Sequence, residues 1–300
     1  MKKIIQSLDT GETTIAHTPI PMVKEGELLI KTKYSLISKG TEKMLVEFGK
    51  SSSINKVKQQ PDKLKVVLDK LKTDGIIPTI EAVYSKLQYP IPMGYCNLGE
   101  VIGKGDGVKD FELGDLVISN GNHAEVVSVP KHLCAKIPND IDQQQAVFTI
   151  LASISLQGIR LAKPTLGEYF VVYGLGMIGL ITVQLLKANG CKVLGIDYDE
   201  DKINLAKEYG ADTICLSDDL DIINYAGSFS RGRGIDSVVI TASSKDNSII
   251  NNAAKMCRKR GRIVLVGITG LNMDREEFYK KELTFQVSCS YGPGLSLIHI

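Results

Sequence analysis

The chain has 300 residues, of which 43% are hydrophobic and 23% are charged. Its formal net charge of +2 is too small to predict nucleic acid or an anionic membrane surface as a partner. No stretch approaches the roughly 20 apolar residues of a membrane span, and the first residues lack the apolar run of a signal peptide. These features predict a cytoplasmic protein of two domains.

The cysteine pattern predicts reduced thiols. The chain contains no CxxC pair, which argues against a disulfide framework and against a structural zinc site. We expect most of the cysteines to behave as small core residues. They are Cys96, Cys134, Cys191, Cys215, Cys257 and Cys289.

Short apolar runs separated by Gly, Pro and Asn occupy the first part of the chain, which predicts an irregular antiparallel β domain over residues 1–140. Residues of about 54–88 interrupt this pattern with helical spacing of leucine and valine, so we expect a helical insertion there with its lysines in solvent. The β runs are ELLIKTKYSLI, GEVIGKG, GDLVISNG and HAEVVSVP.

From residue 141 onward, apolar runs alternate with helix-like stretches. This alternation predicts parallel βαβ units and a doubly wound parallel sheet over residues 141–294. The last residues, LSLIHI at 295–300, can be back-translated into the end of a common transposon sequencing adapter. We therefore expect a non-native read-through tail there. The strand-like runs are YFVVYGL, CKVLGID, DTICL, GIDSVVITA, GRIVLVG and LTFQVSC.

Three glycines in G-x-G-x-x-G spacing, Gly174, Gly176 and Gly179, follow the first of these strands and open a helix, and Asp197 ends the next strand. This context is typical of a dinucleotide-binding loop, in which the glycines permit a tight turn and close approach of the pyrophosphate to the helix N-terminus. The alternative is a strand-to-helix turn without a ligand. The predicted loop residues are Gly174, Leu175, Gly176, Met177, Ile178 and Gly179.

Asp197 favours NAD(H) over NADP(H), because its carboxylate can accept both ribose hydroxyls and would repel a 2′-phosphate. Lys202 lies close enough in sequence to complicate that choice. Two later strand ends should also touch the cofactor at the carboxyl edge of the sheet. Their residues are Thr241, Ala242, Val266 and Gly267.

With FELGDLVISNG and HAEVVSVPKHLCAKIP ahead of this loop, the chain resembles the medium-chain dehydrogenase/reductase superfamily, the zinc-type alcohol dehydrogenase and quinone reductase group. The resemblance implies an α/β fold class, in which a GroES-like irregular β-barrel catalytic domain precedes a Rossmann NAD-binding domain. More specifically, the chain resembles the N-terminal half of bacterial two-domain oxidoreductases linked to surface polysaccharide or nucleotide-sugar metabolism. That resemblance implies a fused C-terminal oxidoreductase domain that is missing here, and it leaves a homo-oligomer open.

The zinc motifs of that superfamily are altered. The C-G-[ST]-D motif matches residues 39–42, Lys-Gly-Thr-Glu, and a shift of one residue would place Ser38 at the cysteine. The G-H-E motif falls on residues 94–96, Gly-Tyr-Cys. A catalytic zinc needs about three protein ligands, and Cys96 with His123 would supply two. We therefore predict no metal, with His123 structural or lining the substrate site.

Without zinc, a hydride transfer still needs a proton donor and charge stabilisation. The resemblance implies Thr41 as the hydroxyl that relays protons. Tyr95, in the former metal pocket, could donate a proton, and Lys39 could stabilise an oxyanion. For each of the three, packing or plain surface exposure is the alternative.

The basic run Lys255, Arg258, Lys259, Arg260 and Arg262 invites a nucleic-acid interpretation, but we expect it at a helix end, where cations suit the helix dipole. The first functional prediction is a zinc-independent NAD(H)-dependent oxidoreductase acting on an alcohol or carbonyl of a sugar derivative. One alternative is a reductase of C=C bonds, as in zinc-free quinone and enoyl reductases. The other is a catalytically silent NAD-binding module.

Overall fold

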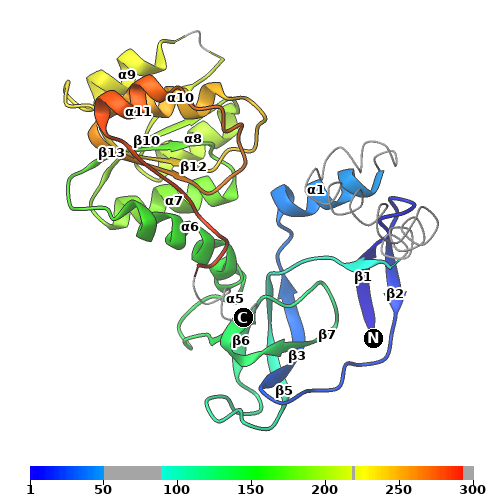
Figure 1. Cartoon of the computed structure of the whole chain (residues 1–300). Coiled ribbons are helices and arrows are strands. Elements are labelled where there is room, and N and C mark those ends of the chain that lie inside the picture. The colour runs from blue at the N-terminus through cyan, green and yellow to red at the C-terminus, as the bar shows by residue number, and fades with distance from the viewer. Residues whose placement is uncertain (51–88, 218–219, 293–300) are drawn as a thin grey trace, which may run out of the picture. The chain divides into compact units, whose positions relative to one another are not determined.

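The computed structural model describes residues 1–50, 89–217 and 220–292 (Figure 1). The chain divides into two compact units, Met1–Ile150 and Leu151–Ile300. The predicted helical insertion at about 54–88 and the predicted tail at 295–300 lie outside the described residues. Within the described part of the chain, no helix is long and apolar enough to cross a membrane.

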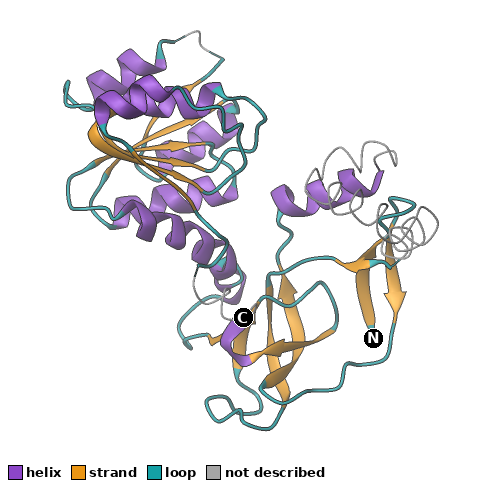
Figure 2. Cartoon of the chain, viewed as in Figure 1, coloured by secondary structure: helices purple, strands orange, loops and turns teal. Residues whose placement is uncertain are grey.

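The first unit is built from two antiparallel sheets, shown as orange arrows in Figure 2. In the larger one, Leu28 and Ile30 are fully buried and pack with Val101 and Val127. The three-stranded sheet has the order β2-β1-β4, with β1 at Lys2–Gln6, β2 at Thr13–His17 and β4 at Ile91–Pro92. The five-stranded sheet has the order β7-β3-β5-β6-β8, with β3 at Glu27–Ser35, β5 at Asn97–Lys104, β6 at Leu116–Ser119, β7 at Val126–Pro130 and β8 at Cys134–Lys136.

Two α-helices and a short 3-10 helix complete the described part of this unit, namely α1 at Lys39–Lys50, η1 at Lys131–Leu133 and α5 at Gln143–Ala146. The unit extends to Ile150, past the predicted boundary at residue 140. The reason is packing: Ala146 and Val147 form one apolar cluster with Leu98 and Ile118 of the β strands. The α5 segment therefore belongs to the β unit.

The second unit is a six-stranded parallel sheet of order β11-β10-β9-β12-β13-β14, which confirms the predicted fold class. Each apolar run that the sequence marked as a strand forms one. The strands are β9 at Tyr169–Tyr173, β10 at Lys192–Asp197, β11 at Asp212–Cys215, β12 at Ile235–Ile240, β13 at Cys257–Leu265 and β14 at Thr284–Val287. The helices are α6 at Thr149–Ala162, α7 at Met177–Ala188, α8 at Glu200–Glu208, α9 at Ile222–Phe229, α10 at Ser248–Met256 and α11 at Arg275–Lys281.

The central strand β9 is buried on both faces, as a parallel strand should be. Val171 packs into a cluster with residues of α9, α10 and α11, whereas Val172 packs into a cluster with residues of α6, α7 and α8. Figure 1 shows α9, α10 and α11 on one side of the sheet and α6 and α7 on the other. The strand order reverses between β9 and β12, and such a switch point is where open α/β sheets bind ligands.

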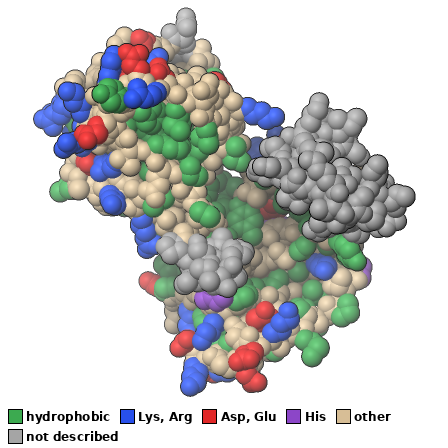
Figure 3. Space-filling model, in the orientation of Figure 1, with side chains coloured by type: hydrophobic (Ala, Val, Ile, Leu, Met, Phe, Trp, Pro, Cys, Tyr) green, Lys and Arg blue, Asp and Glu red, His purple; other side chains and the backbone are tan. Residues whose placement is uncertain are grey.

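The basic run does not lie where the sequence predicted. Only Lys255 is in the last turn of α10, because β13 begins at Cys257 and carries the other four basic residues. Arg258 pairs with Asp236, and Arg262 pairs with Glu168. Figure 3 shows basic and acidic side chains interspersed on the visible face of this unit. Lys255 is therefore the one member of the run that lies at a helix end, whereas Arg258 and Arg262 form ion pairs along a strand.

Candidate functional site

The loop between β9 and α7 has little space for side chains at two of its three glycines. Gly174 has a φ of +98°, and a Cβ atom there would lie 2.5 Å from the backbone nitrogen of Ala242. At Gly179 a Cβ atom would lie 1.9 Å from the carbonyl oxygen of Gly174. These glycines allow the first turn of α7 to pack directly against the ends of β9 and β12.

Gly176 differs from the other two glycines. It is the N-cap of α7 in extended conformation, and a Cβ atom there would meet nothing within 4 Å. Met177 and Ile178, in the first helical turn, are partly exposed, and first-turn N–H groups lack acceptors within a helix. The open space at Gly176 therefore lies beside N–H groups that can bind a phosphate.

The later strand ends predicted to touch the cofactor meet this loop. Thr241 donates its hydroxyl to the carbonyl of Gly174, and Ala242 donates its backbone N–H to the carbonyl of Tyr173 at 3.0 Å. Gly267 packs so closely on the same segment that a Cβ atom would lie 2.1 Å from the carbonyl oxygen of Ala242. Val266 is partly buried and packs against the α6, α7 and α8 cluster.

Asp197 ends β10 with both carboxylate oxygens engaged. Oδ2 accepts the backbone N–H of Leu175 at 2.6 Å, and Oδ1 accepts those of Tyr198 at 2.8 Å and Asp199 at 3.1 Å. The Leu175 side chain is fully buried, which fixes the position of the Leu175 backbone. Its N–H therefore holds the Asp197 carboxylate in place. Lys202 adds a cation, with Nζ 3.5 Å from Asp197 Oδ1 and 3.1 Å from Asp199 Oδ2.

Three hydroxyl groups meet in the first unit, near the start of α1. The half-buried Tyr95 donates a 2.6 Å hydrogen bond to Ser38 Oγ, and its hydroxyl lies 3.4 Å from Thr41 Oγ1. We call Ser38, Thr41 and Tyr95 the hydroxyl cluster. Lys39 is exposed at the first residue of α1, and among the described residues no hydrogen bond or ion pair of its side chain is found.

A buried ionisable pair lies beside the hydroxyl cluster. Glu42 Oε2 is 3.0 Å from His123 Nε2, and the two side chains are 8% and 5% exposed. The other oxygen, Oε1, accepts the backbone N–H of Ser38 at 2.7 Å. Cys96 is also fully buried, and burial together with the charge of Glu42 raises the pKa of its thiol to about 12.

Sequence reasoning missed this pair. Glu42 entered it only as a motif position, and His123 as a structural or substrate-lining residue that was also weighed as a zinc ligand. Ser38 was considered only as a zinc ligand and set aside. No local pattern marked the two side chains as buried, since Glu42 follows Lys-Gly-Thr and His123 follows Asn-Gly-Asn. Nor could a local pattern identify the pair, because 81 positions separate Glu42 from His123.

Comparisons with known proteins agree with this geometry. The family model described as zinc-binding dehydrogenase matches residues 178–296. D-guloside 3-dehydrogenase of Escherichia coli (strain K12) is 29% identical over 209 residues, which cover 66% of this chain and only 59% of that relative's length. These matches support the resemblance to the medium-chain dehydrogenase/reductase superfamily. The same relative is also found in Shigella flexneri, with the same identity and coverage.

Solved structures share the fold of this chain. An alcohol dehydrogenase from Escherichia coli CFT073, complexed with NADH, has a TM-score of 0.77 at 21% identity and covers 100% of this chain and 86% of its own. A protein of Sinorhizobium meliloti 1021, bound to NADP, has a TM-score of 0.75 at 20% identity, covering 99% and 88%. The shared fold thus accommodates either coenzyme in other proteins.

Zinc, which the family description implies, does not fit the residues present in the first unit. Zinc-type members place cysteine and histidine ligands where this chain has Lys39 or Ser38 and Tyr95. The carboxylate of Glu42 is already bonded on both oxygens, and the Cys96 side chain is fully buried. Within the described residues, no group of three or more His, Cys, Asp or Glu could hold a metal ion. The family match begins at residue 178, beyond all of these positions.

Proposed function

We propose that the protein is an oxidoreductase that transfers hydride between NAD(H) and an alcohol or carbonyl group without zinc. The observation that carries this proposal is the open space at Gly176 at the N-terminus of α7, between two glycines that the fold requires. A pyrophosphate would occupy this space and accept hydrogen bonds from the first-turn N–H groups. NAD(H) would then supply the hydride.

The choice of NAD(H) over NADP(H) rests on Asp197. Its carboxylate is held by the backbone N–H groups of Leu175 and Tyr198, which leaves remaining lone pairs for ribose hydroxyls and a negative charge that disfavours a 2′-phosphate. Lys202 reduces that charge locally, so we expect a preference for NAD(H) rather than exclusion of NADP(H).

The proposed substrate is a sugar derivative, as in polysaccharide metabolism. This proposal rests on the 29% identity to D-guloside 3-dehydrogenase, whose name describes oxidation at a sugar carbon. In this chain the proposed proton donor is the hydroxyl of Tyr95, which supports a sugar as the substrate. Hydroxyl groups pair readily with the hydroxyl groups of a sugar.

In the reduction direction, hydride would go to the carbonyl carbon and the Tyr95 hydroxyl would give its proton to the oxygen. Tyr95 then carries the negative charge, which Ser38 Oγ, 2.6 Å away, and Thr41 Oγ1, 3.4 Å away, would stabilise by donating their hydroxyl hydrogens. Oxidation of the alcohol reverses these steps. Lys39 is exposed, so it would add only a positive field.

We place the protein in the cytoplasm. All six cysteines, Cys96, Cys134, Cys191, Cys215, Cys257 and Cys289, are free. Free thiols are typical of reducing compartments.

The proposal is tested by two measurements on the purified chain. Fluorescence titration with NADH and NADPH measures coenzyme binding, and absence of saturable NADH binding would overturn the cofactor assignment. Turnover is then measured with glycosides, sugar alcohols, aldehydes and quinones. We expect oxidation of a sugar hydroxyl, with kcat lowered about 100-fold in Tyr95→Phe and less in Thr41→Ala, in the range of general acid–base contributions.

Other outcomes identify the alternatives. Turnover of quinones alone would assign the protein to the C=C reductases. A folded protein that binds NADH and turns over no compound in the panel would be the silent binding module.

A further inference from the structure

Glu42 connects two segments that are distant in the sequence. Its Oε1 atom accepts the backbone N–H of Ser38 at 2.7 Å, and its Oε2 atom lies 3.0 Å from His123 Nε2. The backbone closes the same turn, because the N–H of Glu42 donates to the carbonyl of Ser38 at 3.0 Å. The carboxylate therefore holds the residue that accepts the hydrogen bond of Tyr95.

His123 supports the Tyr95 side of the hydrogen bond between Tyr95 and Ser38. Its ring lies against Gly94, where a Cβ atom would be 2.5 Å from His123 Cδ2. Its backbone N–H donates to the carbonyl of Met93 at 2.8 Å. Gly94 directly precedes Tyr95, so the imidazole ring supports the segment that carries the Tyr95 hydroxyl.

The pair is costly to keep in the interior. The side chains of Glu42 and His123 are 8% and 5% exposed, and burying such groups lowers stability unless their hydrogen bonds are made. His123 Nδ1 is buried without a protein partner among the described residues. The bond to Glu42 is thus the side-chain hydrogen bond that sets the ring's orientation.

We propose that Glu42 and His123 are positioning residues that hold Ser38 and Tyr95 in the geometry needed for proton transfer. The proposal rests on the function proposed above for Tyr95. Glu42 acts through Ser38, and His123 acts through Glu42 and through the two residues before Tyr95, Met93 and Gly94.

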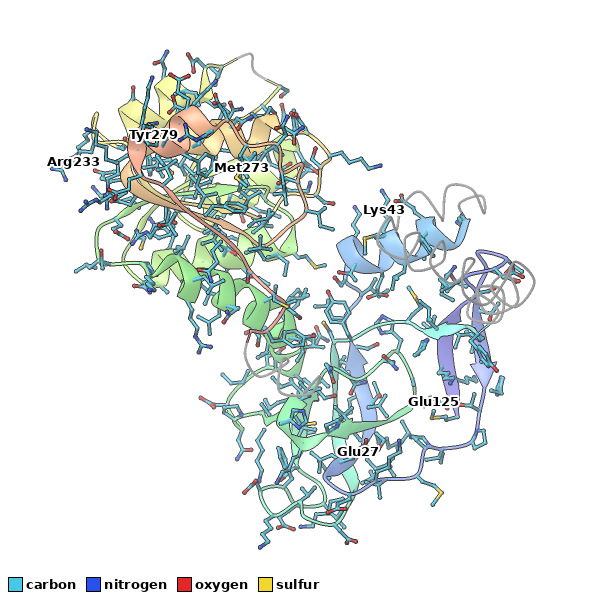
Figure 4. All side chains as sticks on the ribbon, viewed as in Figure 1. Glu27, Lys43, Glu125, Arg233, Met273 and Tyr279 are labelled. Carbon is cyan, nitrogen blue, oxygen red and sulfur yellow. The ribbon has the colours of Figure 1, made fainter. Side chains whose placement is uncertain are left out.

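Two variants separate the role of the carboxylate from its charge. Glu42→Gln keeps an oxygen that can accept the Ser38 N–H and an amide that can face His123, whereas Glu42→Ala removes both bonds. We expect Glu42→Ala to lower kcat by about 30-fold or more with the Kd for NADH unchanged, because a small misplacement of a reacting group can cost about 100-fold in rate. Glu42→Gln should recover most of that loss. Glu47→Gln, an exposed change on the same helix α1 where Figure 4 labels Lys43, is the matched control.

Ser38→Ala shows whether Glu42 acts through the serine. It removes the hydroxyl that Tyr95 bonds but keeps the backbone N–H that Glu42 accepts, so the fold of the turn should survive. If Glu42 acts through Ser38, then Glu42→Ala should cost much less in the Ser38→Ala background than in the wild type. Fully additive losses would overturn the proposal.

A spectroscopic readout makes the test independent of turnover. Tyrosine labelled with ¹³C at Cζ reports the surroundings of each phenol, and the signal missing in Tyr95→Phe identifies Tyr95 among the 11 tyrosines. We expect Ser38→Ala, Glu42→Ala and His123→Leu to shift that signal, and Glu42→Gln to leave it near its place. An unmoved signal in folded Glu42→Ala would overturn the positioning role even if Tyr95 proves essential. A shifted signal with Tyr95→Phe fully active would instead overturn the proposed role of Tyr95.

Discussion

Gly179 and Gly174 are in direct backbone contact: a Cβ atom on Gly179 would lie 1.9 Å from the Gly174 carbonyl oxygen. That carbonyl also accepts the hydroxyl of Thr241. The end of β9, the first turn of α7 and the end of β12 are therefore fixed to one another at the switch point of the sheet. Gly176, two residues after Gly174, is free of such contact.

The difference between Gly179 and Gly176 predicts that alanine at position 179 lowers stability, whereas alanine at position 176 weakens coenzyme binding. Gly179→Ala should lower the free energy of unfolding by about 1–3 kcal/mol, the usual cost of overpacking. Gly176→Ala should leave stability nearly unchanged but raise the Kd for NADH by about 10-fold or more, because the methyl group would fill space next to the helix N-terminus. Urea unfolding and NADH titration measure the two quantities. Equal Kd values for Gly176→Ala and the wild type would show that the pyrophosphate binds elsewhere.

The second unit was the more predictable part of the chain. Its strands contain continuous apolar runs. The spacing of Gly174, Gly176 and Gly179 is typical of a tight turn followed by a helix. What the spacing could not show is that the roles of the glycines differ. Gly174 and Gly179 both contact residues at the end of β12, a strand far from them in the sequence, whereas Gly176 has no such contact.

Coenzyme selectivity should depend on Asp197 and Lys202 in opposite directions. Asp197→Asn keeps one acceptor oxygen, either for the Leu175 N–H or for those of Tyr198 and Asp199, and removes the charge, so the preference for NADH over NADPH should fall by about 10-fold. Lys202→Ala should weaken NADPH more than NADH, because it removes a cation next to the 2′ position. Lys207→Ala, an exposed change on the same helix α8, is the control. A Lys202→Ala variant with unchanged affinity for both coenzymes would place the ribose away from this lysine.

The first unit was predictable in its strands but not in its site. Tyr95 and Thr41 were named from their motif positions, and the structure brings their hydroxyls within 3.4 Å. The bonds of Glu42 to Ser38 and His123 depend on how β strands and α1 pack, which no local pattern specifies. The motif likewise could not predict that Lys39 is exposed at the first residue of a helix.

Thiol reactivity should single out Cys289, the exposed cysteine. The thiolate is the reactive form, and burial raises the pKa of both Cys96 and Cys257 to about 12. In the folded protein at pH 8 we therefore expect one fast-reacting thiol with a disulfide reagent, absent in Cys289→Ser. All six cysteines should react in denaturant. Fast labelling of Cys96, located by peptide mapping, would contradict its buried environment.

The same raised pKa values predict a loss of stability in alkali. In the folded state the pKa of the Cys96 and Cys257 thiols is about 12, whereas in the unfolded chain the pKa of both thiols is near 9.0. Stabilisation by these thiols is complete below pH 9 and is lost as the pH rises from 9 to 12, at about 1.4 kcal/mol per pH unit for each group. Urea unfolding at pH 8 and pH 10 measures the loss. The free energy of unfolding of Cys257→Ala should fall less between pH 8 and pH 10 than that of the wild type. An equal fall would contradict the raised pKa of Cys257.

The ion pairs of β13 differ in how much they should stabilise the second unit. Asp236 is largely buried and accepts two N–H groups, Arg258 Nε at 2.5 Å and the Tyr169 backbone at 2.8 Å. Asp236→Asn has one oxygen for these two donors, so one donor would face an amide N–H. We expect the free energy of unfolding to fall by about 1–3 kcal/mol.

The control for this change is Glu282→Gln. It neutralises the partner of Arg260 in an ion pair whose side chains are 78% and 73% exposed, and such surface pairs contribute little. We expect no measurable change in urea unfolding for Glu282→Gln. Equal losses in the two variants would mean that net charge, rather than the buried hydrogen bonds of Asp236, determines the stability of this edge of the sheet. In that case raising the salt concentration should abolish both losses, because screening acts on exposed charges and leaves buried hydrogen bonds in place.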